Sequence, residues 1–198
     1  MQLLEKINSL DIILASNSPR RKELLHALGV RFSVQTLPTS EAYPQGLQAQ
    51  QIPQYIAQQK AVPFLADIRK NQVIITADTI VWHQGKALGK PANFAQAQQM
   101  LASLSGKVHQ VISALCLSWA SGQKTLCCTT QVHFRPITPQ EIEYYLTHFQ
   151  PWDKAGSYGI QDWIGAVAVE RIEGSYNNVV GLPTQLLLPE LQNLAQTV

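Results

Sequence analysis

The chain has 198 residues, of which 45% are hydrophobic and only 14% charged, and its formal net charge is +2 with a pI near 8.4. This length suits one globular domain with a sizeable core. The near balance of charge argues against an extended basic surface that binds nucleic acid or a membrane, and it leaves room for a local basic site.

Strand and helix patterns alternate in the first half of the chain. Short apolar or alternating runs predict strands at residues 11–16, 31–38 and 73–76. Apolar residues at helical spacing predict helices at residues 19–28 and 50–62. The earlier helix has the clearer boundaries, because Ser18 is a good N-cap, Pro19 suits the first helical position and Gly29 is a natural stop.

The second half adds a hairpin and further helices. Two β-rich runs on either side of Ser121-Gly122 predict the hairpin. Helices are expected at residues 93–105, at 138–149, which opens with a capping box of Thr138 and Glu141, and at 184–195, which is interrupted at Pro189. Residues 152–161 are expected to form a polar loop, and residues 165–183 a strand, a turn and a further extended piece. The order predicts one α/β domain over residues 1–198, with a mixed sheet folded around a cleft.

The cysteines and the first eleven residues indicate the cellular compartment in which the protein is expected. Cys116, Cys127 and Cys128 are the three cysteines, an odd number without CxxC spacing, which argues against a disulfide framework or a zinc site. Residues 1–11 lack the apolar run of a signal peptide, and no segment has about 18 uninterrupted apolar residues. We therefore expect a cytoplasmic protein with no membrane partner.

The stretch SNSPRRKELL, residues 16–25, concentrates positive charge at a helix start. Arg20, Arg21 and Lys22 lie where the helix dipole is positive, an arrangement that costs about 0.3–1 kcal/mol for each surface cation. A bound polyphosphate would offset this cost, and so would nearby carboxylates or solvent. The sequence has neither GxxxxGK[ST] nor GxGxxG after a strand, so a phosphate site here would not be a P-loop or a Rossmann site.

Four other charged residues have a functional and an ordinary interpretation. Asp78 follows the strand expected at 73–76, where a side chain could serve as general base or metal ligand, or simply form a turn. Lys60 and Lys90 are phosphate ligands or solvated lysines. Glu41 is a metal carboxylate or a loop charge. The histidines lack metal-ligand spacing, and the serines lack a GxSxG setting.

Five motifs, LASNSPRRKELL, ADTIV, GKP, DKAGSYGIQ and GSYNNVVGLP, occur in that order between Leu14 and Pro183. Together they resemble the Maf family of nucleoside triphosphate pyrophosphatases. The resemblance implies a Maf/ITPase-like α/β fold, in which a long mixed sheet flanked by helices forms two lobes around a deep cleft. It also implies hydrolysis between the α- and β-phosphates with a divalent cation, Mg²⁺ or Mn²⁺, in a protein that is often a homodimer.

The resemblance also assigns roles to residues. Asp78 of ADTIV matches the general base, and Glu41 together with Asp78 matches the metal-binding carboxylates. The substrate-binding positions are Ser16, Ser18, Arg20, Arg21, Lys60, Thr79, Lys90 and Gln161.

Three of these positions separate subgroups of the family. Arg20, Thr79 and Gln161 resemble the group that hydrolyses dTTP and UTP, and a glutamine amide offers the donor and the acceptor that a uracil or thymine edge needs. Modified pyrimidine triphosphates are further candidate substrates. The alternatives are a pyrophosphatase for 7-methyl-GTP or for inosine or xanthosine triphosphate, and a nucleotide-binding regulator of cell division or septum formation with little turnover.

Overall fold

A seven-stranded mixed sheet organises the chain, which a computed structural model describes over residues 2–197, with side chains from Leu4 onward. Its strands are β1 (Asp11–Leu14), β2 (Ser33–Val34), β3 (Gln72–His83), β4 (Lys86–Leu88), β5 (Val108–Trp119), β6 (Gly122–Phe134) and β7 (Val169–Glu173). The strand order is β2-β1-β3-β5-β6-β7, and β4 pairs with β3. Strand β1 is parallel to β2 and β3, whereas the other pairings are antiparallel.

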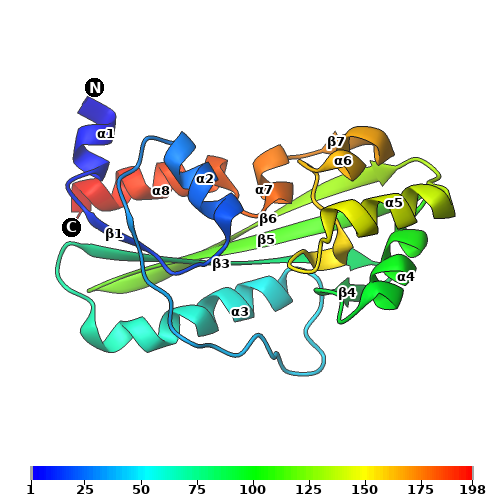
Figure 1. Cartoon of the computed structure of the whole chain (residues 1–198). Coiled ribbons are helices and arrows are strands. Elements are labelled where there is room, and N and C mark those ends of the chain that lie inside the picture. The colour runs from blue at the N-terminus through cyan, green and yellow to red at the C-terminus, as the bar shows by residue number, and fades with distance from the viewer. Residues whose placement is uncertain (1, 198) are drawn as a thin grey trace.

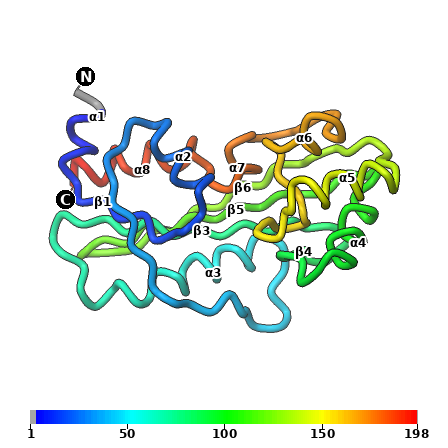
Figure 2. Tube along the Cα trace, in the orientation of Figure 1, coloured from blue at the N-terminus to red at the C-terminus, as the bar shows by residue number. Residues whose placement is uncertain are grey.

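Helices cover both faces of this sheet (Figure 1). They are α1 (Gln2–Ile7), α2 (Pro19–Ala27), α3 (Gln51–Ala61), α4 (Phe94–Leu104), α5 (Pro139–Phe149), α6 (Trp163–Ala168), α7 (Tyr176–Val180) and α8 (Thr184–Thr197), with short 3₁₀ segments η1 (Val62–Asp67) and η2 (Ala155–Ser157). Helix α3 lies on one face, and α2, α7 and α8 lie on the other. Figure 2 shows the first and last helices, α1 and α8, side by side at one end of the sheet.

On one face of the sheet, two apolar cores share the long central strands β3 and β5. Near α1, α2 and α8, one core takes Ile75 of β3 and Leu115 of β5. Near α4, α5 and α6, the other takes Val81 of β3 and Val111 of β5. Between them on the same face lies a polar seam, in which the Thr79 and Ser113 hydroxyls are 2.8 Å apart and Ser113 donates to the carbonyl of Asn178 at 2.8 Å. This seam marks the boundary between two lobes.

Most of the predicted elements are present, and the α/β class with a long mixed sheet is confirmed. The Ser18 hydroxyl caps α2 by accepting from the backbone N–H of Arg21, and Thr138 and Glu141 form a reciprocal capping box at α5. The hairpin turns at residues 120–121 between β5 and β6. The strand expected at 31–38 is reduced to the two residues of β2.

Three local predictions were wrong. Strand β3 has 12 residues and contains Asp78, because its pairing with β5 continues as far as Trp82. Within residues 165–183, the expected strand is present as β7 but begins only after the end of α6, and the expected second extended piece is the helix α7. Helix α8 continues through Pro189, whose cost in a helix interior is about 3 kcal/mol. Buried leucines of α8 offset this cost, because each contributes about 1.5–3 kcal/mol: Leu187, Leu191 and Leu194.

Within residues 2–197, no helix combines the length and the apolar content that a bilayer span requires.

Candidate active site

An uncovered stretch of β3 forms the floor of the main cleft. Strand β1 pairs with β3 only as far as Ile75, and β4 pairs with it from Val81 onward. The edge of β3 at residues 76–80 therefore has no strand beside it, and a cleft of about 530 Å³ opens there. Asp78 lies in the middle of β3 and not after its end, so it reaches the cleft because the neighbouring strand stops, and not because its own strand does.

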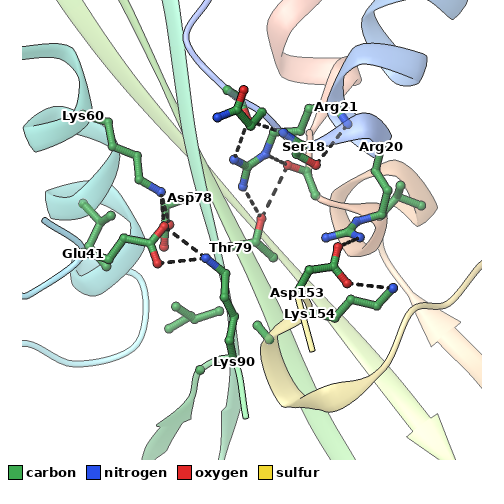
Figure 3. A pocket seen from close by; sticks show the side chains of 18 of the residues that line it. Ser18, Arg20, Arg21, Glu41, Lys60, Asp78, Thr79, Lys90, Asp153 and Lys154 are labelled. Carbon is green, nitrogen blue, oxygen red and sulfur yellow. Dashed lines mark hydrogen bonds and ion pairs between the residues drawn. The ribbon is translucent and has the colours of Figure 1, made fainter. Parts of the chain in front are cut away.

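Successive side chains of a strand point to opposite faces, so Asp78 and Thr79 lie on different sides of the sheet. On the α3 side, Lys60 Nζ donates to Asp78 Oδ1 and to Glu41 Oε1, in each case at 2.8 Å. Lys90 Nζ donates to Glu41 Oε2 at 3.0 Å. Figure 3 shows these side chains converging on one place. Glu41 comes from the segment between β2 and α3, which crosses from one face of the sheet to the other (Figure 1).

On the α2 side, Arg21 is the centre of a second cluster. Its Nε donates to the carbonyl of Gly181 at 2.9 Å, and its two Nη atoms lie 3.3 Å from Ser16 Oγ and from Thr79 Oγ1. Ser18 caps the helix that carries Arg21, and its own N–H donates to Ser16 Oγ at 3.2 Å. These contacts hold the guanidinium between α2, β3 and the end of α7 (Figure 3).

A third cluster joins α2 to the loop after α5. Arg20 Nη1 donates to Asp153 Oδ2 at 2.6 Å, and Lys154 Nζ donates to Asp153 Oδ1 at 2.9 Å. Asp153 and Lys154 are not among the site residues expected from the sequence, although both lie in the DKAGSYGIQ motif. The only signal that could have indicated them is a charged pair at the start of a glycine-rich loop.

The charges of the cleft favour an anionic ligand. It is lined by five cationic and three anionic side chains, Arg20, Arg21, Lys60, Lys90, Lys154, Glu41, Asp78 and Asp153. Burial raises the pKa of Asp78 above its ordinary value, against the opposing effect of Lys60 and Arg21. Burial also acts to raise the pKa of Glu41, but hydrogen bonds and attraction from Lys60 and Lys90 outweigh it and hold the value at about 2.

The remaining walls of the cleft are largely apolar. One apolar wall comes from side chains that belong to or pack against the second core: Val81, Val111, Ala155, Tyr158, Val179 and Val180. Gln161 adds an amide to this part of the cleft. The cleft therefore offers charged groups to a phosphate chain and an apolar wall with one polar side chain to a ring.

The structure brings all the residues singled out from the sequence to this one cleft. They are Ser16, Ser18, Arg20, Arg21, Glu41, Lys60, Asp78, Thr79, Lys90 and Gln161. Thr79 Oγ1 already contacts Arg21 and Ser113, so part of its hydrogen-bonding capacity is used within the protein.

The carboxylates of Glu41 and Asp78 fit a divalent cation. Both lie 2.8 Å from the Lys60 ammonium, so two hard oxygen donors already converge on one positive charge. Over residues 2–197, no group of three or more histidine, cysteine, aspartate and glutamate side chains is arranged to hold a metal. The other ligands of a cation here would therefore be phosphate oxygens and water, as is common for Mg²⁺.

The fold and the cleft together indicate a class: an α/β protein whose cleft, with its excess of cationic side chains, suits a small phosphorylated molecule. Comparison with known sequences gives the family. The model of the Maf family, described as Maf-like protein, matches residues 11–194, and the chain belongs to that family.

Relatives match over nearly the whole chain. A protein of Bacteroides fragilis named dTTP/UTP pyrophosphatase is 53% identical over 193 residues, covering 97% of this chain and 100% of its own. Proteins of the same name from Phocaeicola vulgatus and Porphyromonas gingivalis are 51% and 42% identical, over 97% and 98% of this chain and 100% of their own lengths. A solved structure, the Staphylococcus aureus Ham1 protein, is a weaker match, with a TM-score of 0.45 and 14% identity over 63% of this chain and 71% of its own.

Proposed function

We propose that this protein is a nucleoside triphosphate pyrophosphatase that hydrolyses dTTP and UTP, and modified pyrimidine triphosphates, to the monophosphate and pyrophosphate. The observation that carries the proposal is a buried carboxylate, Asp78, in a cleft lined by five cationic side chains, an apolar wall and the amide of Gln161. The relatives named dTTP/UTP pyrophosphatase support the choice of substrate.

The cationic groups bind the triphosphate. Arg20 and Arg21 lie in the first turn of α2, whose free N–H groups add a partial positive charge. Lys60 and Lys90 approach from the opposite side of β3, so the two pairs hold the phosphate chain across the edge of that strand. As pyrophosphate leaves, the same groups stabilise the charge that accumulates on it.

Asp78 acts on the attacking water. Its carboxylate removes a proton as the water oxygen attacks the α-phosphorus, and the oxygen between the α- and β-phosphorus atoms leaves with pyrophosphate. Burial raises the pKa of Asp78, which makes it a better base than an exposed aspartate, and the bond from Lys60 fixes its orientation. When a divalent cation is bound by Glu41, Asp78 and phosphate oxygens, it supplies further neutralisation of the triphosphate charge.

Gln161 reads the base. Uracil and thymine present a ring N–H donor beside carbonyl acceptors, and one glutamine amide can pair with a donor and an acceptor together. Arg20 and Thr79 complete the set that distinguishes pyrimidine substrates. We place the reaction in the cytoplasm, where the three free thiols stay reduced, with the nucleoside triphosphate as the partner and no role for nucleic acid.

A panel of nucleoside triphosphates assayed for pyrophosphate release with Mg²⁺ and with Mn²⁺ tests the proposal. We expect kcat/KM to be highest for dTTP and UTP. Faster hydrolysis of 7-methyl-GTP or of inosine triphosphate would overturn the substrate assignment. Tight binding of dTTP with no measurable turnover would instead favour a regulatory protein.

A further inference from the structure

The loop that carries Gln161 is fixed at three points. The N–H of Gly156 donates to the carbonyl of Gly89 at 3.0 Å, and the N–H of Gly159 donates to the Tyr145 hydroxyl at 3.1 Å. The third point is a hydrogen bond of 2.7 Å between the Tyr158 hydroxyl and His109 Nε2. Three different parts of the fold therefore determine where residues 156–161 lie.

The backbone of the loop near the first of these contacts, at Gly156 and Ser157, has little conformational freedom. Gly156 has a positive φ of 68°, and a Cβ atom there would come within 2.8 Å of Val81 Cγ2. Ser157, which is fully buried, also has a positive φ, of 61°, an uncommon conformation for a residue other than glycine. The contacts on either side of Ser157 must therefore hold a backbone that would not adopt this conformation by itself.

His109 lies beneath the cleft in a group of packed rings. Its side chain is 2% exposed, and its ring centroid lies 4.9 Å from Phe134, 5.4 Å from Tyr158 and 6.5 Å from His83. Tyr158 is the one member of this group that lines the cleft. A change at His109 can therefore reach a bound ligand through Tyr158 and its loop.

His109 is neutral at physiological pH, because burial, with smaller contributions from His83 and His133, lowers its pKa to about 3. It therefore has no acid–base task near neutrality. What it offers is a directed hydrogen bond through Nε2 in a dry environment, where an unpaired Tyr158 hydroxyl would be costly. The other ring nitrogen, Nδ1, has no hydrogen-bond partner among the described residues. The mechanism described above makes no use of this group.

We propose that His109 is a positioning residue for nucleobase recognition. By holding the Tyr158 hydroxyl, it fixes the loop of residues 156–161 and so places Gln161 against the pyrimidine edge. This inference rests on the proposed function, since it takes the apolar wall of the cleft as the place of the base. Asp78, the α2 arginines and Lys60 of α3 are attached to other elements, so their chemistry does not depend on this hydrogen bond.

The expected signature is a change of KM and of selectivity with little change of kcat. In His109→Phe and in Tyr158→Phe, we expect KM for dTTP to rise about tenfold, the effect of losing one buried hydrogen bond of about 1.4 kcal/mol. The ratio of kcat/KM for dTTP to that for dCTP should fall by a similar factor. The kcat for dTTP should stay within threefold of wild type.

A double-variant cycle tests the coupling. Because both substitutions remove the same bond, the double variant should be no worse than either single one. The matched control is His83→Phe, which replaces a histidine of the same ring group whose Nε2 has no hydrogen-bond partner among the described residues. It should leave KM and the ratio unchanged. His109→Gln, which retains an amide able to reach the hydroxyl, should recover part of the loss.

Two results would overturn the proposal. One is a KM and a dTTP/dCTP ratio within twofold of wild type in Tyr158→Phe, the variant that changes least volume. The other is a double variant whose loss is the product of the single losses. If wild-type enzyme failed to hydrolyse dTTP, the proposed function would be wrong, whatever the role of His109. Equilibrium binding of dTTP and dCTP to the same variants would then test the positioning role of His109.

Discussion

Replacing Asp78 by asparagine tests the central chemical assignment. Asparagine has nearly the same volume and keeps an oxygen that can accept the hydrogen bond from Lys60 Nζ, now 2.8 Å long. The substitution therefore removes the base and its negative charge while preserving the local geometry. We expect a folded enzyme that binds nucleotide and turns it over very slowly.

The magnitude follows from the position of Asp78. Loss of a positioned general base costs about 10²–10⁴ in kcat, equivalent to about 2.7–5.4 kcal/mol of transition-state stabilisation. The cleft has five cationic and three anionic side chains, so removing one carboxylate increases its positive excess. KM for dTTP should accordingly stay the same or fall, and the loss should appear in kcat.

Pyrophosphate release from dTTP, measured over a range of Mg²⁺ concentrations, distinguishes the two roles given to this carboxylate. If Asp78 mainly holds the metal, high Mg²⁺ should restore the rate of Asp78→Asn. If it is the base, the rate should stay low at every concentration. Asp67→Asn, an exposed carboxylate outside the cleft, is the control and should behave as wild type. A kcat within threefold of wild type in Asp78→Asn at low Mg²⁺ would show that Asp78 is not the general base.

Three further predictions concern charge and packing. Lys60→Met removes a cation that opposes protonation of Asp78, so the acid limb of the pH profile of kcat/KM should move to higher pH. An unchanged profile would count against the ion pair between Lys60 and Asp78. Glu41 has a pKa of about 2 in the folded protein, below its unfolded value of 4.5, so its stabilisation is present above pH 4.5 and is lost as the pH falls toward 2. Since Glu41 is about half exposed, Glu41→Gln should reduce the acid dependence of the unfolding free energy by only about 1 kcal/mol, as measured by urea denaturation at several pH values. Gly165→Ala would place a Cβ atom 1.8 Å from the backbone oxygen of Ile160, and it should lower the unfolding free energy by about 2–3 kcal/mol or more, with a matching fall in the denaturation midpoint.

Local signals predicted much of the fold because they depend on few residues. The Ser18 cap, the Thr138–Glu141 capping box and the turn of the β5–β6 hairpin are each specified within a few positions, and all three are present. The same reasoning failed for α7, a helix of five residues, and at Pro189 of α8. In α8, the burial of distant leucines decides the conformation, and no window of the sequence shows what they pack against.

The motifs of the sequence identify which residue types matter, but not how they meet. Charge and motif pattern alone indicate Arg21, Lys60 and Asp78. Arg21 and Lys60 lie on opposite faces of β3 because side chains alternate along a strand. Asp78 therefore contacts Lys60 of α3, and Thr79 contacts Arg21 of α2. The sequence predicts that Asp78 follows the end of a strand, because polar residues around it interrupt an apolar run. In the structure, the pairing of β3 with β5 continues through Asp78 and overrides that local signal.

The kind of chemistry can be predicted from the sequence alone: it has cations, a carboxylate and an amide in the order of the Maf motifs, and helix starts fixed by their caps. Where these groups are exposed to a ligand depends on the three-dimensional fold. The cleft exists because β1 ends at Leu14 and β4 begins to pair only at Val81, leaving one stretch of β3 open. The hydrogen bond between His109 and Tyr158 likewise joins residues 49 positions apart. Strand register and ring packing are properties of residues distant along the chain, so no local pattern encodes them.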